Sequence, residues 1–248
     1  MEAARRKWHI ECAARAYRAG DGAALHGRMG DSWLSATRKV FPSGGGHLDL
    51  GCGAGRMTFA LSDLWSSGGW SVGADRNDEA LAEAEIRARE ENLAAARFVR
   101  LDVEKEDYAP LLRGMTPDLI TAHLCMGHEI ARRAAAALAP GGIFAFAALH
   151  PDLWKESGFT SRFALPERSV ESILDQFDLS PLFLRVEKEI LEFESPPDLL
   201  DGYFRNGETV PGWRSDGRWD ALREYVHSGG RTLTTRAQCQ CVAQKASP

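Results

Sequence analysis

Three glycines at alternate positions, Gly51, Gly53 and Gly55, lie between a short apolar segment (47–50) and a segment with helical character (56–65). Glycine lets the backbone turn tightly and lets a ligand approach where a side chain would collide with it. The first turn of a helix offers unpaired N–H groups and a partial positive charge, which favour an anionic ligand group. The spacing G-x-G-x-G differs from the dinucleotide fingerprint G-x-G-x-x-G. The segment therefore predicts a ligand-binding loop, with a spacing that argues against a nicotinamide-dependent oxidoreductase.

Two aspartates follow later predicted strands in the same way. Asp75 ends the second strand, and Asp102 ends the third. In nucleotide-binding α/β folds, an acid at the position of Asp75 accepts hydrogen bonds from the ribose hydroxyls. Asp102 has a second interpretation, because an aspartate after a strand often only caps a helix. Both fall at carboxyl ends of strands, where open α/β sheets bind their ligands.

Two histidines are the candidate catalytic residues, since His123 and His150 follow the predicted fourth and fifth strands. Each could act as a general base or contact a substrate, and each could equally be a hydrogen-bonded structural histidine. Cys52 lies inside the glycine loop. We interpret it as a small packing residue, because no base is evident beside it.

Aromatic residues gather in the later part of the chain: Trp154, Phe159, Phe163, Tyr203, Phe204, Trp213, Trp219 and Tyr225. A substrate pocket needs apolar walls with a few polar groups. The loops that carry these rings are placed to supply such a wall, and Trp154 and Tyr203 are the candidate pocket residues. The alternative is that the rings only anchor an otherwise irregular insertion.

The elements that position these residues alternate as in βαβ units. The expected strands cover residues 47–50, 70–74, 98–101, 119–122, 143–149, 182–193 and 232–242. The expected helices cover residues 2–19, 31–41, 56–65, 78–92, 129–138 and 169–177. The segment 194–230 is rich in Pro, Gly and aromatic residues, and we expect it to be irregular.

A single domain accounts for residues 1–248. We divide it into an N-terminal helical cap (1–44), a cofactor-binding core (45–150), and substrate-side elements with the last two strands (151–248). The nearly all-apolar strand 143–149 is typical of a central position in a sheet that is covered on both faces. We therefore expect an α/β fold.

Composition excludes several classes of function. The chain has 30 Lys and Arg against 35 Asp and Glu, a formal net charge of −5, which argues against a generally basic nucleic-acid-binding protein. No run approaches the roughly 20 apolar residues that span a bilayer, and the N-terminus lacks an apolar secretory core. The cysteines are odd in number and scattered: Cys12, Cys52, Cys125, Cys239 and Cys241. We expect reduced thiols, no metal site and a cytoplasmic protein.

Four segments together resemble the class I S-adenosylmethionine-dependent methyltransferases. They are Asp49-Leu50-Gly51-Cys52-Gly53-Ala54-Gly55, Gly73-Ala74-Asp75, Leu101-Asp102-Val103 and Leu138-Ala139-Pro140-Gly141-Gly142. Their order and spacing match the family over about residues 45–150. The resemblance implies a doubly wound, mostly parallel seven-stranded sheet with helices on both faces and an antiparallel C-terminal strand. The N-terminal helices would be an extension of that fold.

The resemblance also implies a cofactor, S-adenosyl-L-methionine, and the residues that hold it. The expected cofactor-binding residues are Asp49, Gly51, Cys52, Gly53, Gly55, Asp75, Arg76, Asp102, Val103, Ala122 and His123. The glycine loop would cradle the methionine part, and Asp49 would orient its amino group. Asp75 would hold the ribose hydroxyls, while Asp102 and the Val103 N–H would contact adenine.

Two further positions follow from the same resemblance. Ala122 and His123 would line the region of the sulfonium. Arg76 departs from the family, which often has an apolar residue under the adenine, but a guanidinium can also stack on a base.

The implied activity is transfer of a methyl group to an acceptor, with S-adenosyl-L-homocysteine as product. The sequence Ala122-His123-Leu124-Cys125 stands where enzymes that methylate amino groups of DNA often carry an Asn/Asp-Pro-Pro-Tyr/Phe run. We therefore expect a small-molecule acceptor, with no nucleic-acid or membrane partner. The alternatives are a nicotinamide-dependent oxidoreductase, an aminopropyltransferase-like enzyme, and a non-catalytic protein that binds S-adenosylmethionine. The acceptor and the oligomeric state are open.

Overall fold

A computed structural model describes residues 8–18, 29–195, 200 and 209–247 of the chain. Within this part, eight strands form one sheet in the order β1-β7-β8-β6-β5-β2-β3-β4. The strands are β1 (Glu11–Arg18), β2 (Gly46–Leu50), β3 (Trp70–Asp75), β4 (Ala96–Arg100), β5 (Leu119–His123), β6 (Ile143–Leu149), β7 (Leu179–Glu192) and β8 (Thr232–Lys245). β8 is antiparallel to both of its neighbours, and the other pairs are parallel. The expected doubly wound, mostly parallel sheet is confirmed, with eight described strands instead of seven.

The additional strand corrects the expected N-terminal helix over residues 2–19. Residues 11–18 form β1, which pairs in parallel with β7 at the edge of the sheet. Two ion pairs join these strands, Arg15 with Glu187 and Arg185 with Glu11. Contacts far apart in the sequence therefore override the helical propensity of this alanine-rich segment. The rest of the expected helix, residues 2–7 and 19, lies outside the described residues, apart from 8–10, which form no regular element.

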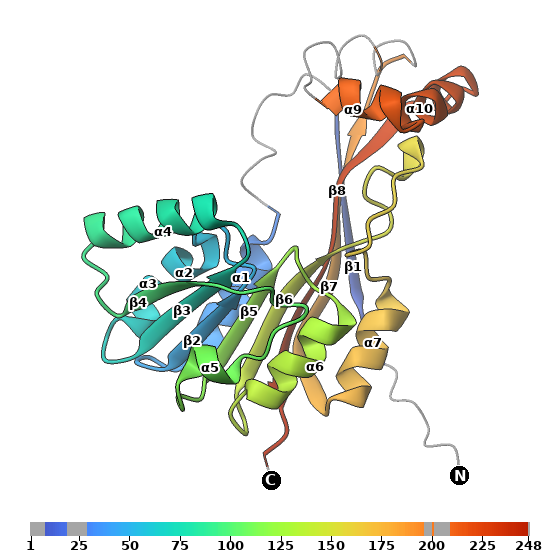
Figure 1. Cartoon of the computed structure of the whole chain (residues 1–248). Coiled ribbons are helices and arrows are strands. Elements are labelled where there is room, and N and C mark those ends of the chain that lie inside the picture. The colour runs from blue at the N-terminus through green and yellow to red at the C-terminus, as the bar shows by residue number, and fades with distance from the viewer. Residues whose placement is uncertain (1–7, 19–28, 196–199, 201–208, 248) are drawn as a thin grey trace.

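Helices cover both faces of the sheet (Figure 1). One face carries α1 (Asp31–Val40), α2 (Arg56–Ala60), α3 (Ser62–Trp65) and α4 (Asp78–Glu90), and the other carries α5 (Ala109–Leu112), α6 (His128–Ala137) and α7 (Glu167–Gln176). The expected helix over 56–65 is divided into α2 and α3 at Leu61. The two faces have separate apolar cores, so the parallel strands between them are buried on both sides.

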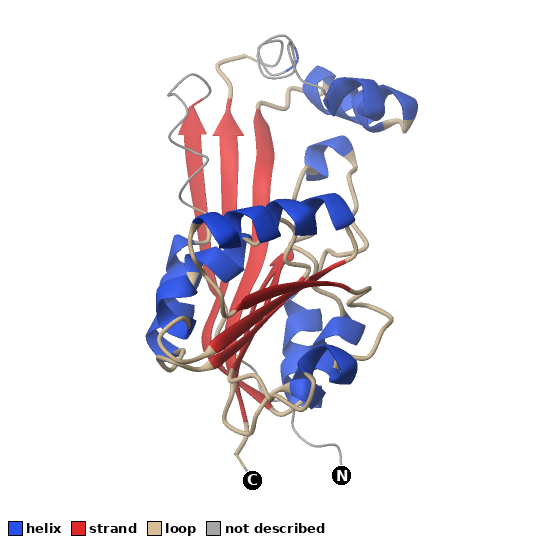
Figure 2. Ribbon diagram, turned by 60° about the vertical axis from the view of Figure 1, so that its left-hand side comes forward, coloured by secondary structure: helices blue, strands red, loops and turns tan. Residues whose placement is uncertain are grey.

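The long strands β7 and β8 continue beyond the other strands and form, with β1, an arm above the sheet (Figures 1 and 2). Two helices at its end, α9 (Thr209–Ser215) and α10 (Arg218–His227), form a cap. These helices correct the expectation of an irregular segment over 194–230. The cap and the arm share a core of their own, made of Leu191, Phe193, Trp213, Leu222, Val226 and Leu233. In the described part of the chain, no helix is both long and apolar enough to cross a membrane.

Candidate functional site

A cavity of about 310 Å³ lies at the carboxyl ends of the central strands. It is lined by Gly51, Asp75, Arg76, Asn77, Leu101, Asp102, Val103, Glu104, Cys125, Ile130 and Phe163. Five of the predicted cofactor-binding residues therefore meet around one space: Gly51, Asp75, Arg76, Asp102 and Val103. The other predicted residues do not line it. The remaining lining residues were not predicted to bind the cofactor, although Phe163 was among the aromatic residues considered for a pocket wall; they are Asn77, Leu101, Glu104, Cys125, Ile130 and Phe163.

The glycine loop needs its glycines for two different reasons. All three have positive φ, namely +63° at Gly51, +50° at Gly53 and +82° at Gly55, and other residues rarely adopt this conformation. A Cβ on Gly51 would lie 2.6 Å from Sγ of Cys125, and one on Gly55 would lie 2.5 Å from the ring of Phe59. A Cβ on Gly53 would meet no atom within 4 Å. The loop is thus packed at its two ends and open at its middle.

The turn after β5 closes one side of the loop. Leu124 has φ of +63°, an unusual conformation for a leucine, and its N–H donates to the Ala147 carbonyl oxygen at 2.7 Å. The following residue, Cys125, donates from Sγ to the Leu50 carbonyl oxygen at 3.2 Å. Burial raises the pKa of Cys125 to about 12 and also raises that of Cys52. Both thiols are therefore protonated at neutral pH, which fits the packing role expected for Cys52.

Asp75 joins the glycine loop to the start of α4. One carboxylate oxygen accepts from the Gly53 N–H at 2.8 Å, and the other accepts from the Asn77 N–H at 2.9 Å. Each oxygen of a carboxylate can accept more than one hydrogen bond, so both keep capacity for a ligand hydroxyl. The side chain is thereby fixed at the cavity wall before any ligand binds.

Asp102 shapes the turn after β4. Its side chain accepts from the Glu104 N–H at 3.1 Å and lies 3.4 Å from Nζ of Lys105. Desolvation raises its pKa, but the Glu104 hydrogen bond and the charges of Lys105 and Arg76 outweigh this effect and hold the pKa below its usual range. The side chain therefore stays ionised at neutral pH and bonds within its own turn instead of capping a helix.

Asp49 is buried beneath the glycine loop. Its carboxylate accepts from the N–H of Thr58 at 3.0 Å, from the hydroxyl of Thr58 at 2.8 Å and from the hydroxyl of Thr121 at 2.8 Å. Burial raises its pKa to about 6, although the hydrogen bonds from Thr121 and Thr58 act in the opposite direction. The carboxylate thus anchors α2 to the sheet and places a buried acid under the cradle.

Sequence reasoning also missed a polar network that continues from Asp49. His47 lies two residues earlier on the same face of β2, and its ring nitrogens lie 2.8 Å from the Thr121 hydroxyl and 2.9 Å from the Ser71 hydroxyl. Burial lowers the pKa of His47 to about 3, so the ring is neutral. Because Thr121 donates to Asp49, it accepts from His47, which then accepts from Ser71. The signal in the sequence was the alternation of polar residues along an otherwise apolar strand.

The two candidate catalytic histidines lie on opposite faces of the sheet. His123 ends β5 on the face of α1, and its ring lies 5.7 Å from that of Trp33. Burial, with a smaller effect of Arg56, lowers its pKa to about 4. His150 is buried on the face of α7, where Nδ1 accepts from the Asp152 N–H at 3.1 Å and Nε2 lies 3.3 Å from the carboxylate of Glu167. Neither histidine lines the cavity, and Ala122 is fully buried.

The candidate pocket aromatics are not both described. Trp154 packs edge-to-face against Trp213 of the cap, with ring centroids 5.2 Å apart. Tyr203 lies outside the described residues. In the described part of the chain, no group of three or more His, Cys, Asp or Glu side chains could hold a metal ion.

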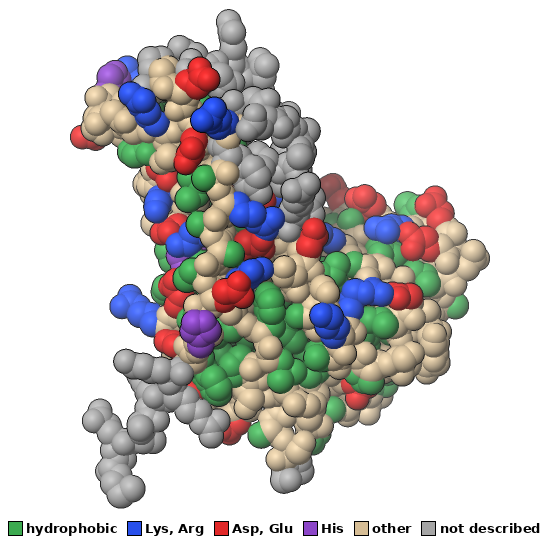
Figure 3. Space-filling model, turned by 180° about the vertical axis from the view of Figure 1, so that it is seen from behind, with side chains coloured by type: hydrophobic (Ala, Val, Ile, Leu, Met, Phe, Trp, Pro, Cys, Tyr) green, Lys and Arg blue, Asp and Glu red, His purple; other side chains and the backbone are tan. Residues whose placement is uncertain are grey.

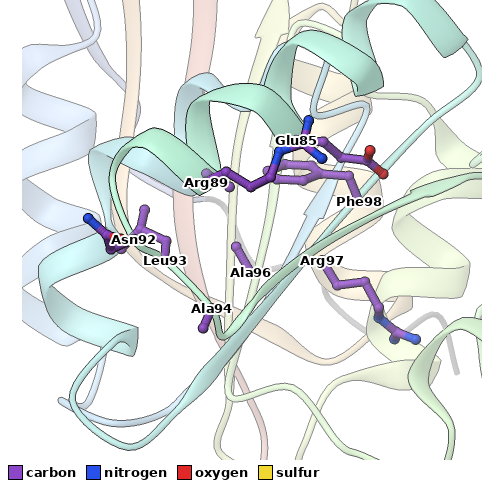
Figure 4. Close-up of a pocket in the computed structure, with 9 residues that line it drawn as sticks. Glu85, Arg89, Asn92, Leu93, Ala94, Ala96, Arg97 and Phe98 are labelled. Carbon is purple, nitrogen blue, oxygen red and sulfur yellow. The ribbon is translucent and has the colours of Figure 1, made fainter.

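Two other hollows lie away from the carboxyl ends. One of about 520 Å³ lies between α4 and β4, near the amino end of that strand, and Figure 4 shows Arg89, Leu93 and Phe98 around it. The other, of about 610 Å³, lies between α1 and β7, where Leu182 is exposed. Seen from behind, hydrophobic side chains gather on the body of the molecule below the arm (Figure 3). Neither hollow contains the glycine loop or the strand-end aspartates.

Comparison with known proteins agrees with this geometry. A family model described as a methyltransferase domain matches residues 43–182, more than half of the chain. The fold is similar to that of YcgJ from Bacillus subtilis (14% identity, 88% of this chain and 99% of that chain, TM-score 0.63). It is also similar to a candidate methyltransferase from Bacillus halodurans (16% identity, 87% of this chain and 100% of that chain, TM-score 0.61). A third similar structure is the cyclase SpnF (20% identity, 87% of this chain and 79% of that chain, TM-score 0.55). No match was found among curated proteins.

At these identities the structural likeness concerns the fold alone, whereas the family model concerns the sequence itself. The matched residues include the glycine loop and both strand-end aspartates. They also include the five parallel strands β2 to β6, with their turns, that bring these residues together. The chain therefore belongs to the class I S-adenosylmethionine-dependent methyltransferases.

Proposed function

We propose that this chain transfers a methyl group from S-adenosyl-L-methionine to a small molecule and releases S-adenosyl-L-homocysteine. The observation that carries the proposal is the cavity in which Gly51, Asp75 and Asp102 meet. It combines a backbone cradle with two fixed carboxylates, which suits a ligand that has an amino-acid group, two ribose hydroxyls and an adenine.

Each proposed contact has support in the described residues. The open space at Gly53 would accept the methionine part, and the buried carboxylate of Asp49, near the end of the preceding strand, would favour its ammonium group. The free lone pairs of Asp75 would accept the ribose hydroxyls. The Val103 N–H donates no hydrogen bond within the described part of the chain, so it is available to an adenine nitrogen beside Asp102.

When bound, the cofactor supplies a methyl group that is already activated by its sulfonium. The task of the protein is then to hold the acceptor in line and to exclude water, which can be worth about 7–11 kcal/mol of the barrier. His123 is neutral at physiological pH and could accept a proton from a hydroxyl acceptor, although its lowered pKa makes it a weak base. His150 is the second candidate, and its contact with Glu167 favours an orienting role.

The acceptor would enter from the side of the arm and cap. The net charge of −5 disfavours a large polyanion such as a nucleic acid. We propose that Trp154, held by Trp213, supports the acceptor wall together with Tyr203.

Calorimetric titration with S-adenosylmethionine, S-adenosylhomocysteine and NADH tests the proposal. We expect micromolar binding of the two sulfur compounds and none of NADH, followed by methyl transfer in a screen of acceptors. Asp75→Ala should weaken binding at least about tenfold because the ribose loses its acceptor, whereas Asp78→Ala, three residues on and exposed, should not. Binding of NADH alone would make the oxidoreductase the working hypothesis. Binding of the cofactor with no turnover of any acceptor would favour the non-catalytic alternative.

A further inference from the structure

We infer that Phe163, held by Arg162, forms the wall of the cavity that contacts the adenosyl group of the cofactor. Both residues belong to the loop between β6 and α7, far in sequence from the glycine loop and the strand-end aspartates. The inference rests on the proposed function, because it names how this chain recognises an adenosine-bearing ligand.

The backbone of the loop returns to the carboxyl end of β6. Ala164 forms a parallel bridge with Leu149, and the Leu165 N–H donates to the Leu149 carbonyl oxygen at 2.8 Å. A turn at Ser161 precedes this bridge, because the Ser161 hydroxyl accepts from the Phe163 N–H at 3.2 Å and its carbonyl oxygen accepts from the Ala164 N–H at 3.0 Å. Phe163 is thus fixed on both sides at the edge of the sheet where the cavity lies.

An ion pair connects the loop to the opposite rim of the cavity. The two terminal nitrogens of Arg162 donate to the two carboxylate oxygens of Glu104, at 2.9 Å and 2.8 Å. Glu104 lines the cavity and lies two residues after Asp102, in the turn proposed to contact adenine. An exposed ion pair contributes little to stability, but a paired guanidinium–carboxylate contact fixes orientation. The loop is therefore aligned with the adenine end of the cavity.

The ring of Phe163 is positioned for stacking. The guanidinium carbon of Arg162 lies 4.1 Å from the centroid of this ring, so the cation covers one of its faces. Phe163 is also among the residues that line the cavity, and we propose that the ring face that the guanidinium leaves uncovered meets the ligand. Aromatic side chains stack on nucleobases regardless of base identity, and a cation on the far face adds to this contact. Arg162 thus acts as a positioning residue, and Phe163 as the contacting one.

Binding of two ligands by variants tests the inference. S-adenosylhomocysteine carries the whole product, and 5′-methylthioadenosine carries its adenosyl part without the amino acid. Phe163→Ala should raise the dissociation constants of both ligands by a similar factor of about ten. Phe163→Tyr should restore most of the affinity. Phe159→Ala, in the same loop but with its ring against Arg218, is the matched control and should bind both ligands like the wild type.

Arg162→Lys keeps the charge and loses the paired contact, so it should weaken both ligands by a smaller factor than Phe163→Ala. Arg168→Ala, at an exposed residue of α7, is its control. Because Arg162 is itself exposed, these two variants test the inference even where Phe163→Ala does not fold. A wild type that binds neither ligand overturns the proposed function. A wild type that binds both, with Phe163→Ala and Arg162→Lys binding equally well, overturns this inference alone. Loss of S-adenosylhomocysteine with unchanged methylthioadenosine would place Phe163 at the methionine end and also reject it.

Discussion

Asp49, Asp75 and Asp102 lie in three different environments, which give their carboxylates different hydrogen-bond partners and different burial. Asp102 is held ionised by neighbouring donors and cations at the surface of its turn. Asp75 is clamped by two backbone N–H groups at the cavity wall. Asp49 is enclosed, and burial outweighs three hydrogen bonds to raise its pKa to about 6. Burial therefore brings the pKa of Asp49 toward neutral pH.

Cofactor binding should therefore depend on pH through Asp49. Below pH 6 the protonated carboxyl no longer attracts the ammonium of the ligand, so affinity for S-adenosylhomocysteine should fall about tenfold between pH 7 and pH 5. Calorimetric titration across this range gives the measurement. Methylthioadenosine lacks the ammonium group and is the control, with an affinity that should stay nearly constant. An equal loss for both ligands would assign the titration to another group.

The same group has an effect of opposite sign on stability. The pKa of Asp49 is raised in the folded state, so the folded protein binds more protons than the unfolded chain between about pH 4 and pH 6. The contribution of Asp49 to the free energy of unfolding is therefore largest below pH 4 and is lost as pH rises through 6. Asp102 has a lowered pKa and contributes in the other direction, with stability that is lost as pH falls.

Residues at strand ends could be predicted from the sequence because their position follows from local pattern alone. Asp75 ends a recognisable strand, Gly51 and Asp102 follow the ends of two others, and parallel strands bring their carboxyl ends to one edge. Phe163 could not be placed, because its position depends on the bridge of Ala164 to Leu149 and on the ion pair of Arg162 with Glu104, 58 positions away. The partners of His47 on two neighbouring strands were hidden for the same reason.

At the scale of elements, the start of α2 requires a glycine at position 55. Gly55 has φ of +82° and precedes α2, and a Cβ there would meet the ring of Phe59. Gly55→Ala should cost about 1–2 kcal/mol for the left-handed conformation and a further 1–3 kcal/mol for overpacking. Urea unfolding measures the change.

Gly114→Ala provides the matched control for this substitution. Gly114 has φ of +84° and no atom within 4 Å of the added Cβ, so only the conformational cost applies. A drop in stability as large as that of Gly55→Ala would show that the contact with Phe59 relaxes freely. A clearly larger drop for Gly55→Ala is expected.

The βαβ core could be predicted because its apolar strands and helical segments alternate with clear turn signals. β1 could not, since its alanines favour a helix and its strand form depends on β7 and on the charges of Glu187 and Arg185. The helix α10, in contrast, could have been predicted from its sequence pattern. Trp219, Leu222 and Val226 recur at helical spacing within the segment that composition alone labelled irregular.

At the scale of the whole molecule, the arm separates the cap core from the cores on the two faces of the sheet. The cap core lies beyond the sheet, whereas the cavity is supported by the cores on the two faces of the sheet (Figure 2). Trp213 is 2% exposed at the centre of the cap core. This arrangement predicts that damage to the cap leaves the cofactor site intact.

Trp213→Ala tests that separation. Loss of a buried tryptophan typically costs about 3–5 kcal/mol, which here should appear as local opening of the cap. Hydrogen exchange should become faster in α9 and α10, while the dissociation constant of S-adenosylhomocysteine should change by less than about twofold. Weakened cofactor binding would instead reveal coupling along the arm. Loss of turnover with intact cofactor binding would place the acceptor site next to the cap.

The pairing of β1 with β7 at the edge of the sheet also determines when β1 can form during synthesis. Glu11 and its partner Arg185 are 174 residues apart, so β1 pairs with a strand that is made much later. At about 5–20 residues per second, the N-terminal segment waits for roughly 9–35 s before β7 exists. During that interval the alanine-rich segment has only its local preferences, which favour a helix. Strands β2 to β6 can therefore pair during synthesis before β1 does, because β1 has no partner in the sheet until β7 has been made.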